Sequence, residues 1–411
     1  MSAVEPSSSS LRPRIFLGTA VVLLLVLLAV LVVMFYNLIK PTGMPGGTQG
    51  IDGMVWVRSM YGFGPTQDEQ LRQPSSVAIA PNGDVYATDP MRARIMIFRA
   101  DGTFRRLLHT GAGGTEEGQF IRPESIDIDD TGDVYIADSW AGKIIVFDAD
   151  GLYSREWPVE TQARGVHVSD GKVFVLDVGK VLVFDTQGEE LGAFGSRGPA
   201  PGQIDAYQGV VQKNGVVYVA ESFNKRLQAF DESGTVLWTV PDGIAARPGP
   251  RASTTSAPSA SASEASPGHR WDLPQDLTVD ARNRLVVVDA FQFEIAVVDP
   301  KTGTVQARYG EYGREEGQFF YPTSIDYDPV RDWFAVADTN NGRIQIVRIP
   351  DSANPGAATA WRATSSPFRY LAVPGLLFFI ALGLGAWSAR KLWRGAVSQP
   401  SEALLTEDSD R

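Results

Sequence analysis

The sequence has no cysteine and only three histidines among its 411 residues. The chain therefore contains neither a disulfide nor a Cys-ligated metal. The histidines His109, His167 and His269 fall at unrelated points of the pattern described below, so a shared zinc site is not expected. Acidic residues outnumber basic ones, 48 to 37, which gives a formal net charge of −11. Nucleic acid is therefore not an expected partner, because its binding needs a basic surface.

Long apolar runs are confined to the two ends of the chain. Residues 15–39 carry no charge and are mostly Val, Leu and Ile, whereas a bilayer core requires about 20 such residues. The run is too long for a cleaved signal peptide and predicts a signal anchor. A second run, residues 368–389, has aromatic residues near both ends and basic residues after it, as membrane spans do.

Basic residues next to these runs predict their orientation. Arg12 and Arg14 precede the first run, and Arg390, Lys391 and Arg394 follow the second. The positive-inside rule therefore places both tails, 1–14 and 390–411, in the cytoplasm. Residues between the spans are expected outside the cell membrane, with tethers at 40–53 and 350–367.

Residues 54–349 contain six copies of one strand pattern. Each copy has short runs rich in Val, Ile, Tyr and Phe, separated by Gly, Asp and Asn, which is typical of antiparallel strands joined by tight turns. The copies are Gln73–Phe98, Gly118–Asp150, Gly165–Phe184, Gly209–Phe230, Leu273–Val298 and Tyr321–Val347. An acid follows the second strand of each: Asp89, Asp138, Asp177, Glu221, Asp289 and Asp338. A period near 40–50 residues with four strands per unit predicts an all-β, six-bladed propeller.

The last copy lacks a fourth strand. Met54–Gly64 resembles the fourth strands of the other copies, so it is expected to close the ring by pairing into the last blade. Closure removes the exposed edges that an open sheet would leave. The Ala-, Ser- and Pro-rich residues 243–269 have little apolar surface to bury and are expected to be a loop inserted in the ring.

Three motifs resemble the NHL-repeat family of six-bladed propellers. They are Gly-Gln-Phe-x-x-Pro (Gly118–Pro123, Gly317–Pro322), Gly-Asp-Val-Tyr (Gly83–Tyr86, Gly132–Tyr135) and Ala-Asp-x-x-x-x-[Arg/Lys]-Ile (Ala137–Ile144, Ala337–Ile344). The arrangement is similar to the sensor propellers of actinobacterial receptor kinases, without the kinase. The resemblance implies a fold and leaves activity open.

The recurring acids are interpreted as turn residues, because a residue type that occurs in every blade suits architecture better than chemistry. A cation follows in five blades: Arg94, Lys143, Lys180, Arg226 and Arg343. Blade 5 has Glu294 at that position, which makes Glu294 a better functional candidate than the repeated acids.

Two metal sites are considered as alternatives. Asp127, Asp129 and Asp138 partly imitate a calcium loop, although the equivalent residues of blade 1 form a hairpin turn. Related lactonase-like propellers hold a central calcium, and polar residues near the starts of inner strands leave such a site open here: Glu124, Gln208, Asp276 and Ser324. No catalytic residue is assigned, and no cofactor is expected beyond this possible calcium.

Non-repeating residues on the loops of one face, which we call the top, are the ligand-binding candidates. They are Arg92, Trp140, Phe223, Asn224, Phe291, Gln292, Phe293, Glu294, Asn340 and Asn341. Aromatic residues flanked by Arg, Asn and Gln suit a protein or a glycan. The leading hypothesis is a non-catalytic, membrane-anchored binding module. The alternatives are an extracytoplasmic metal-dependent lyase or lactonase-like enzyme, and an accessory subunit whose spans contact a membrane partner.

Overall fold

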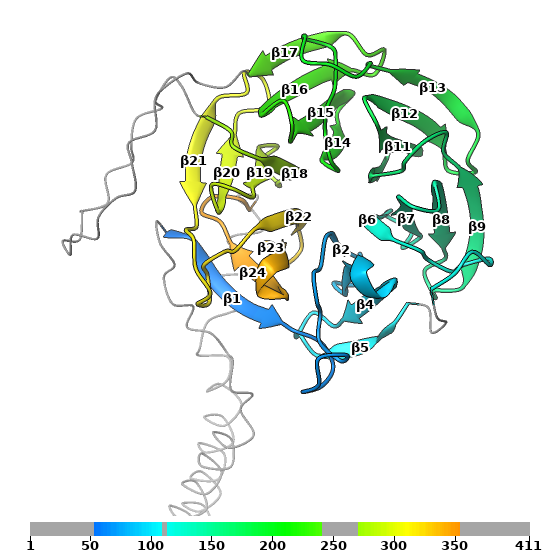
Figure 1. Cartoon of the computed structure of the whole chain (residues 1–411). Helices are drawn as coiled ribbons and strands as arrows, with labels where there is room; N and C mark the ends of the chain where they lie inside the picture. The colour runs from blue at the N-terminus through cyan, green and yellow to red at the C-terminus, as the bar shows by residue number, and fades with distance from the viewer. Residues whose placement is uncertain (1–52, 109–112, 241–269, 354–411) are drawn as a thin grey trace, which may run out of the picture. The chain divides into compact units, whose positions relative to one another are not determined.

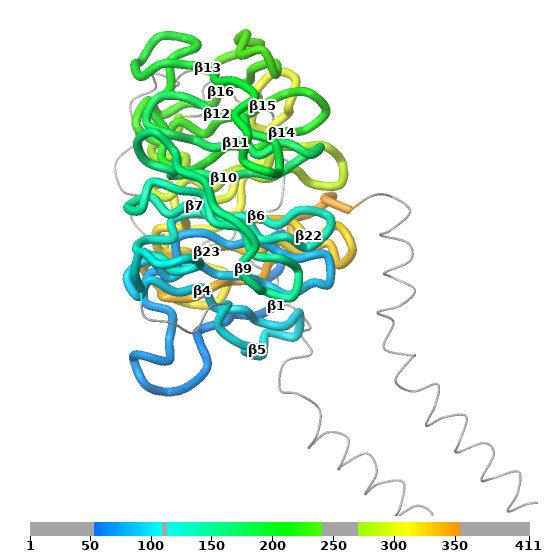
Figure 2. The backbone as a smooth tube through the Cα atoms, turned by 90° about the vertical axis from the view of Figure 1, so that its right-hand side faces the viewer, coloured from blue at the N-terminus to red at the C-terminus, as the bar shows by residue number. Residues whose placement is uncertain are grey.

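The computed structural model describes residues 53–108, 113–240 and 270–353. They form six four-stranded antiparallel sheets arranged in a ring around a central axis (Figure 1). The prediction of an all-β, six-bladed propeller is confirmed. Figure 2 shows the ring edge-on.

The strands of each blade follow one another outward from this central axis (Figure 1). Blade 1 contains β2 (Val77–Ile79), β3 (Val85–Asp89), β4 (Arg94–Phe98) and β5 (Phe104–Leu107); blade 2 contains β6 (Pro123–Ile128), β7 (Val134–Asp138), β8 (Lys143–Phe147) and β9 (Tyr153–Pro158). Blade 3 contains β10 (Gly165–Ser169), β11 (Lys172–Asp177), β12 (Lys180–Asp185) and β13 (Glu190–Phe194); blade 4 contains β14 (Val210–Lys213), β15 (Val216–Glu221), β16 (Arg226–Asp231) and β17 (Val236–Val240). Blade 5 contains β18 (Pro274–Val279), β19 (Leu285–Asp289), β20 (Glu294–Val298) and β21 (Val305–Tyr309); blade 6 contains β22 (Pro322–Asp328), β23 (Trp333–Asp338) and β24 (Arg343–Arg348), together with β1 (Val55–Met60).

Blade 6 is closed by the start of the chain. β1 pairs antiparallel with β24, with Val55 opposite Arg348 and Met60 opposite Ile344. Figure 1 shows β1, in blue, beside the orange β24. The predicted closing segment continued to Gly64, but β1 ends at Met60. The strand stops there because Tyr61 accepts a bond from Leu71 and the chain folds into a loop.

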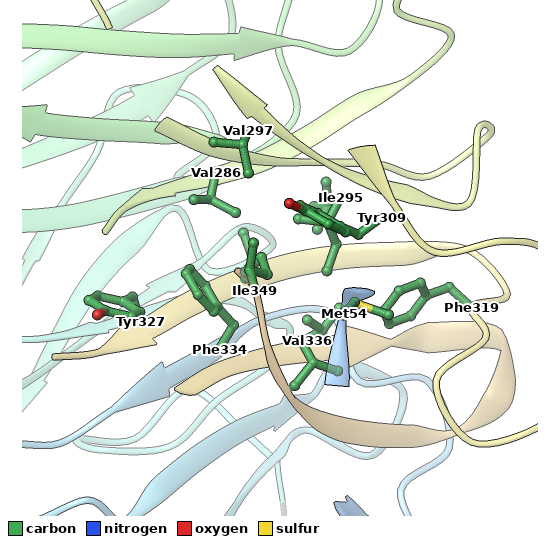
Figure 3. Close-up of a cluster of buried hydrophobic side chains, with 13 residues drawn as sticks. Met54, Val286, Ile295, Val297, Tyr309, Phe319, Tyr327, Phe334, Val336 and Ile349 are labelled. Carbon is green, nitrogen blue, oxygen red and sulfur yellow. The ribbon is translucent and has the colours of Figure 1, made fainter. Parts of the chain in front are cut away.

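Hydrophobic side chains fill the spaces between neighbouring blades. Met54, Phe319 and Phe334 are fully buried in the cluster that joins blade 5 to blade 6 (Figure 3). Similar clusters join the other neighbours, for example Tyr135 of blade 2 with Leu182 of blade 3. Because each blade buries its faces only against its neighbours, the ring is the stable unit.

The two ends of each blade differ in the loops they carry. We keep the name top for the end where the second strand turns into the third, and we call the opposite end the bottom. β24 ends and β1 begins at the bottom of blade 6. A Cβ atom added to Gly53 would lie 3.5 Å from Cγ of Pro350, so the two ends of the propeller are neighbours.

The two predicted spans and the insert lie outside the described residues. Within residues 53–108, 113–240 and 270–353, no helix is long and apolar enough to cross a membrane.

Candidate functional site

The six recurring acids are fully buried at the top of the blades and bind loop backbone. Asp138 accepts bonds from the N–H groups of Ile121 (2.6 Å) and Arg122 (2.9 Å). Asp289 accepts bonds from Leu273 and Phe291, at 2.9 and 3.1 Å. The carboxylates thus hold the loop entering each blade and the turn after its second strand. This geometry supports their interpretation as turn residues.

The cations that follow these acids fall into two groups. Arg94, Arg226 and Arg343 contact the acid of their own blade at 3.0, 2.7 and 2.8 Å. The two lysines instead contact other acids: Lys143 lies 2.9 Å from Glu156, and Lys180 lies 2.7 Å from Glu160. An arginine both reaches the buried carboxylate and donates to loop carbonyls, which a single ammonium group does less well.

Glu294 of blade 5 lies opposite Asp289 in the sheet, where other blades have a cation. Its side chain is largely buried, and its Oε1 lies 4.0 Å from Nε of Arg308 on the neighbouring strand. Burial, opposed by Arg308 and reinforced by Asp289, raises the pKa of Glu294 to about 7.

Side chains of the inner strands bind the backbone of the next blade. Ile126 N–H donates to Ser76 Oγ at 3.3 Å, and Val166 N–H donates to Ser125 Oγ at 3.2 Å. Val77 N–H likewise donates to Ser324 Oγ, and Ile325 N–H donates to Asp276 Oδ2, each at 3.2 Å. Ser324 and Asp276 therefore satisfy backbone donors at the channel wall. That contact was not visible in the sequence, because it joins residues far apart in the chain.

Nearer the bottom of the channel, polar side chains of the inner strands also join neighbouring blades. Asp127 accepts a bond from Val168 N–H at 2.8 Å, and Asp326 accepts one from Ile79 N–H at 2.7 Å. His167 Nδ1 lies 2.8 Å from Asp127 Oδ2, and Nε2 lies 3.3 Å from the Gln212 carbonyl. Burial would lower the pKa of His167, but the Asp127 charge and these two acceptors raise it overall.

The upper channel is crossed by Gln208. Its buried amide donates to the carbonyls of Thr323 (2.6 Å) and Ser75 (3.0 Å), on blades 6 and 1. Glu124 beside it accepts bonds from Tyr207 and from Arg122 Nε. All four candidates for a central calcium therefore take part in contacts that hold the ring together.

The structure does not bring the calcium-loop candidates together. Asp129 accepts bonds from Thr131 and Asp133 N–H, each at 2.9 Å, and thereby shapes the turn at the bottom of blade 2. Asp138 lies at the opposite end of the sheet, paired with Pro123. Among the described residues, no three His, Asp or Glu side chains are grouped so as to hold one metal ion. His109 and His269 lie outside them.

A cavity of about 440 Å³ lies at the bottom end of the channel. All six blades contribute to its lining, blade 1 through Ile79 and the others, in order, through Asp127, His167, Lys213, Thr278 and Asp326. Asp127, His167 and Asp326, which join neighbouring blades as described above, form part of its walls.

Most polar candidates on the top face bind their own loops. Arg92 donates to the Gln67 carbonyl at 2.6 Å, and Gln292 donates to Asp272 at 2.6 Å. Asn224 donates to the Gly198 carbonyl at 2.8 Å, and Asn341 donates to that of Gly313 at 3.0 Å. Asn340 donates from its backbone to Phe320. These candidates therefore shape the top loops.

Four apolar side chains on the top face occupy one repeat position, the second residue after the buried acid. Met91, Trp140, Phe223 and Phe291 are 48, 69, 55 and 51% exposed. We call these four residues the top-face apolar group. Sequence reasoning identified the three aromatic members and missed Met91, although its spacing from Asp89 marks it.

Packing orients the aromatic members. Arg122 lies 5.2 Å from the Trp140 ring, and Phe291 lies 5.6 Å from Tyr321. The Phe293 ring packs against the Tyr312 ring, with centroids 4.9 Å apart, and so forms part of the packing of the loops. Blade 3 has Gly179 at this position, and blade 6 has Asn340. The top-face apolar group therefore forms two pairs, one on blades 1 and 2 and the other on blades 4 and 5.

These features define a six-bladed β-propeller. Residues 65–163 match a family described as a 6-bladed beta-propeller, DUF5128. No protein of curated function matches the chain.

Several solved structures resemble the chain. A streptogramin B lyase is 11% identical, covering 71% of this chain and 96% of that one, with a TM-score of 0.47. Virginiamycin B lyase from Staphylococcus aureus is 15% identical, covering 75% and 95%, with a TM-score of 0.46. Hydrazine synthase from Kuenenia stuttgartiensis is 12% identical, covering 70% and 99%, with a TM-score of 0.47. At such identities the activities of these proteins do not transfer to this chain.

Proposed function

We propose that this protein is a membrane-anchored, extracytoplasmic propeller that binds a protein or a glycan through its top face and catalyses no reaction. The observation that carries this proposal is the top-face apolar group, whose members repeat at one turn position and stay exposed. Exposed apolar patches on soluble domains mark interaction sites.

A protein is the favoured ligand of the two. Glycan recognition needs free hydrogen-bonding groups, whereas Arg92, Asn224 and Gln292 donate to their own loops. Aromatic and Met side chains are enriched in protein interfaces. A metal-dependent lyase or lactonase is not favoured, because Glu124, Gln208, Asp276 and Ser324 are engaged in contacts between blades. A role as accessory subunit of a membrane complex is compatible with this proposal.

Matched triple variants test the proposal in full-length protein captured from its native membranes after crosslinking. Trp140→Ala, Phe223→Ala and Phe291→Ala together should abolish capture of the proteins bound by the wild type. The control combines Leu152→Ala, Leu191→Ala and Leu237→Ala, whose side chains are 66, 56 and 51% exposed away from the top turns. Equal loss of capture in the two triple variants, or no loss in either of them, would refute top-face binding.

A further inference from the structure

Five aromatic side chains meet on the top face, where blade 5 adjoins blade 6. Phe291 and Phe293 lie in the turn between β19 and β20, and Tyr312, Phe320 and Tyr321 lie in the segment between β21 and β22. Ring centroids are 5.6 Å apart for Phe291 and Tyr321, 4.9 Å for Phe293 and Tyr312, and 5.4 Å for Tyr312 and Phe320. Phe291 and Tyr312 are 51 and 57% exposed, and the other three are half-buried. We call these five residues the aromatic surface.

Two residues of the aromatic surface have a left-handed backbone conformation, which favours glycine. The φ angle is 58° at Phe293 and 66° at Tyr321, and no other aromatic residue that the structure describes has a positive φ. At the position of Phe293, blades 2 and 6 have Gly142 and Gly342. A bulky side chain in this conformation strains the backbone, and such strain concentrates at functional sites. The strain indicates that these rings do more than stabilise the loops.

The aromatic surface also presents two hydroxyl groups. In the described part of the chain, neither the phenol oxygen of Tyr312 nor that of Tyr321 has a hydrogen-bond partner. The neighbouring amide groups of Gln292 and Asn341 are instead engaged with the loops themselves. A ligand on this surface therefore meets aromatic faces and two O–H donors, and a segment rich in carbonyl acceptors suits both.

Acidic side chains border the aromatic surface. Glu311 directly precedes Tyr312, and Glu315 follows it three residues later. Both are exposed, and neither forms an ion pair with any cation of the described residues. Glu311 accepts a bond from the Gln318 side chain at 2.6 Å, which holds its carboxylate beside the same loop. Two negative charges at this edge are therefore available to a ligand.

The neighbouring charges do not cancel these two carboxylates. The nearby cations of other segments already face other acids: Arg343 lies 3.6 Å from Glu316, and Arg270 lies 3.2 Å from Asp272. Arg314 is the only cation of residues 310–321, and its guanidinium lies 5.9 Å from the centre of the Phe320 ring. Arg314 therefore offsets one carboxylate and shows how a cation packs over these rings. The remaining negative charge complements a basic partner.

We propose that the aromatic surface binds a proline-rich segment of a partner protein that also carries arginine or lysine. Proline has no N–H group, and a polyproline II segment has no internal hydrogen bonds, so its carbonyls are free to accept from the two phenols. Such segments dock on aromatic side chains and lose little entropy on binding. Basic side chains of the segment would face Glu311 and Glu315. This inference rests on the proposed function, because it specifies which protein the top face binds.

Selection of a phage-displayed library of random dodecapeptides on the full-length protein in detergent tests the proposal. The wild type should enrich peptides that combine several prolines with arginine or lysine. Tyr312→Ala should reduce the affinity of an enriched peptide at least tenfold, and Tyr312→Phe, which keeps the ring and loses the O–H, should reduce it several-fold. Leu152→Ala, at a 66% exposed position in a bottom turn, should leave the affinity unchanged.

A charge-swapped pair of measurements tests the acidic border separately. Glu311→Gln combined with Glu315→Gln should reduce the affinity for the enriched peptide several-fold. The same double variant should bind as the wild type does when glutamine replaces each arginine or lysine of the peptide. An equal effect on both peptides would contradict the role assigned to the two carboxylates.

Three other outcomes would overturn the proposal. Enrichment of peptides without proline, or of no peptide at all, rules out a proline-rich ligand. Equal affinity of the wild type and Tyr312→Ala for an enriched peptide rules out the aromatic surface. Dimers of the free protein that Tyr312→Ala dissociates, measured by light scattering, would assign the surface to a second copy of the chain. If peptide selection fails while the variant lacking Trp140, Phe223 and Phe291 still loses its captured partner, this inference is wrong and the proposed function stands.

Discussion

His167 Nδ1 lies 2.8 Å from Asp127 Oδ2, which joins blade 3 to blade 2 near the bottom of the channel. Both ring nitrogens face oxygen acceptors, so the fold favours the imidazolium form. Asp127→Asn should lower the pKa of His167 and reduce the free energy of unfolding by about 1.5–3 kcal/mol, the usual contribution of a hydrogen bond to a charged group. Nuclear magnetic resonance titration measures the pKa of His167, and denaturant unfolding measures the free energy. Asp130→Asn, at an exposed neighbouring position, should change neither.

The buried carboxyls of the channel predict a dependence of stability on pH. Burial raises the pKa of Asp276 and of Asp326 to about 7. Their ordinary pKa is about 3.9, so the folded state binds protons that the unfolded chain releases. The stabilisation is complete below about pH 4 and is lost as the pH rises towards 7. The melting temperature should be higher at pH 5.5 than at pH 8.5, and Asp326→Asn should reduce that difference. An unchanged difference in the variant would contradict the assignment.

The two kinds of cation at the top of the blades predict unequal effects of substitution. Arg226 donates to the carbonyls of Pro199, Ala200 and Gln203 as well as to Glu221. Arg226→Lys leaves several of these acceptors without a donor and should cost roughly 2–3 kcal/mol. Lys180→Met removes only an exposed pair with Glu160 and should cost no more than about 1 kcal/mol. Chemical denaturation of the full-length protein compares them, and equal costs would contradict this difference.

Closure of the ring by the start of the chain predicts a contrast between two methionines. Met54 is fully buried between blades 5 and 6, whereas Met91 is 48% exposed. Met54→Ala should cost about 2–5 kcal/mol, because it leaves a cavity where the ring closes. Met91→Ala should change the free energy of unfolding by less than about 0.5 kcal/mol. A small effect at Met54 would mean that β1 contributes little to stability.

The absence of native cysteine permits a direct test of topology. A single cysteine can be placed at Ser233, in the turn after β16, or at Ser401, in the C-terminal tail. In intact cells a membrane-impermeant maleimide should label the first position and label the second only after lysis. Labelling of Ser401→Cys in intact cells would contradict the proposed orientation.

Sequence reasoning could predict the ring because the blade pattern is local. The alternation of Val134–Asp138 and Lys143–Phe147, with the acid between them, identifies each hairpin without knowledge of the rest. The contacts that complete the ring join distant residues: Gln208 reaches Thr323 across the channel, and Trp333 meets Arg58 only after closure. The partner of a side chain is equally invisible in the sequence, since the pattern shows that Lys143 follows Asp138 but not that its ammonium group contacts Glu156.

Site-specific photo-crosslinking tests binding through the top face most directly. Benzoylphenylalanine placed at Trp140 and at Leu152 of the full-length protein compares two equally exposed positions of blade 2, one in a top turn and one in a bottom turn. Irradiation of intact cells should join position 140 to a defined partner protein and leave position 152 without it. The same adduct from both positions, or an adduct from position 152 alone, would contradict the account.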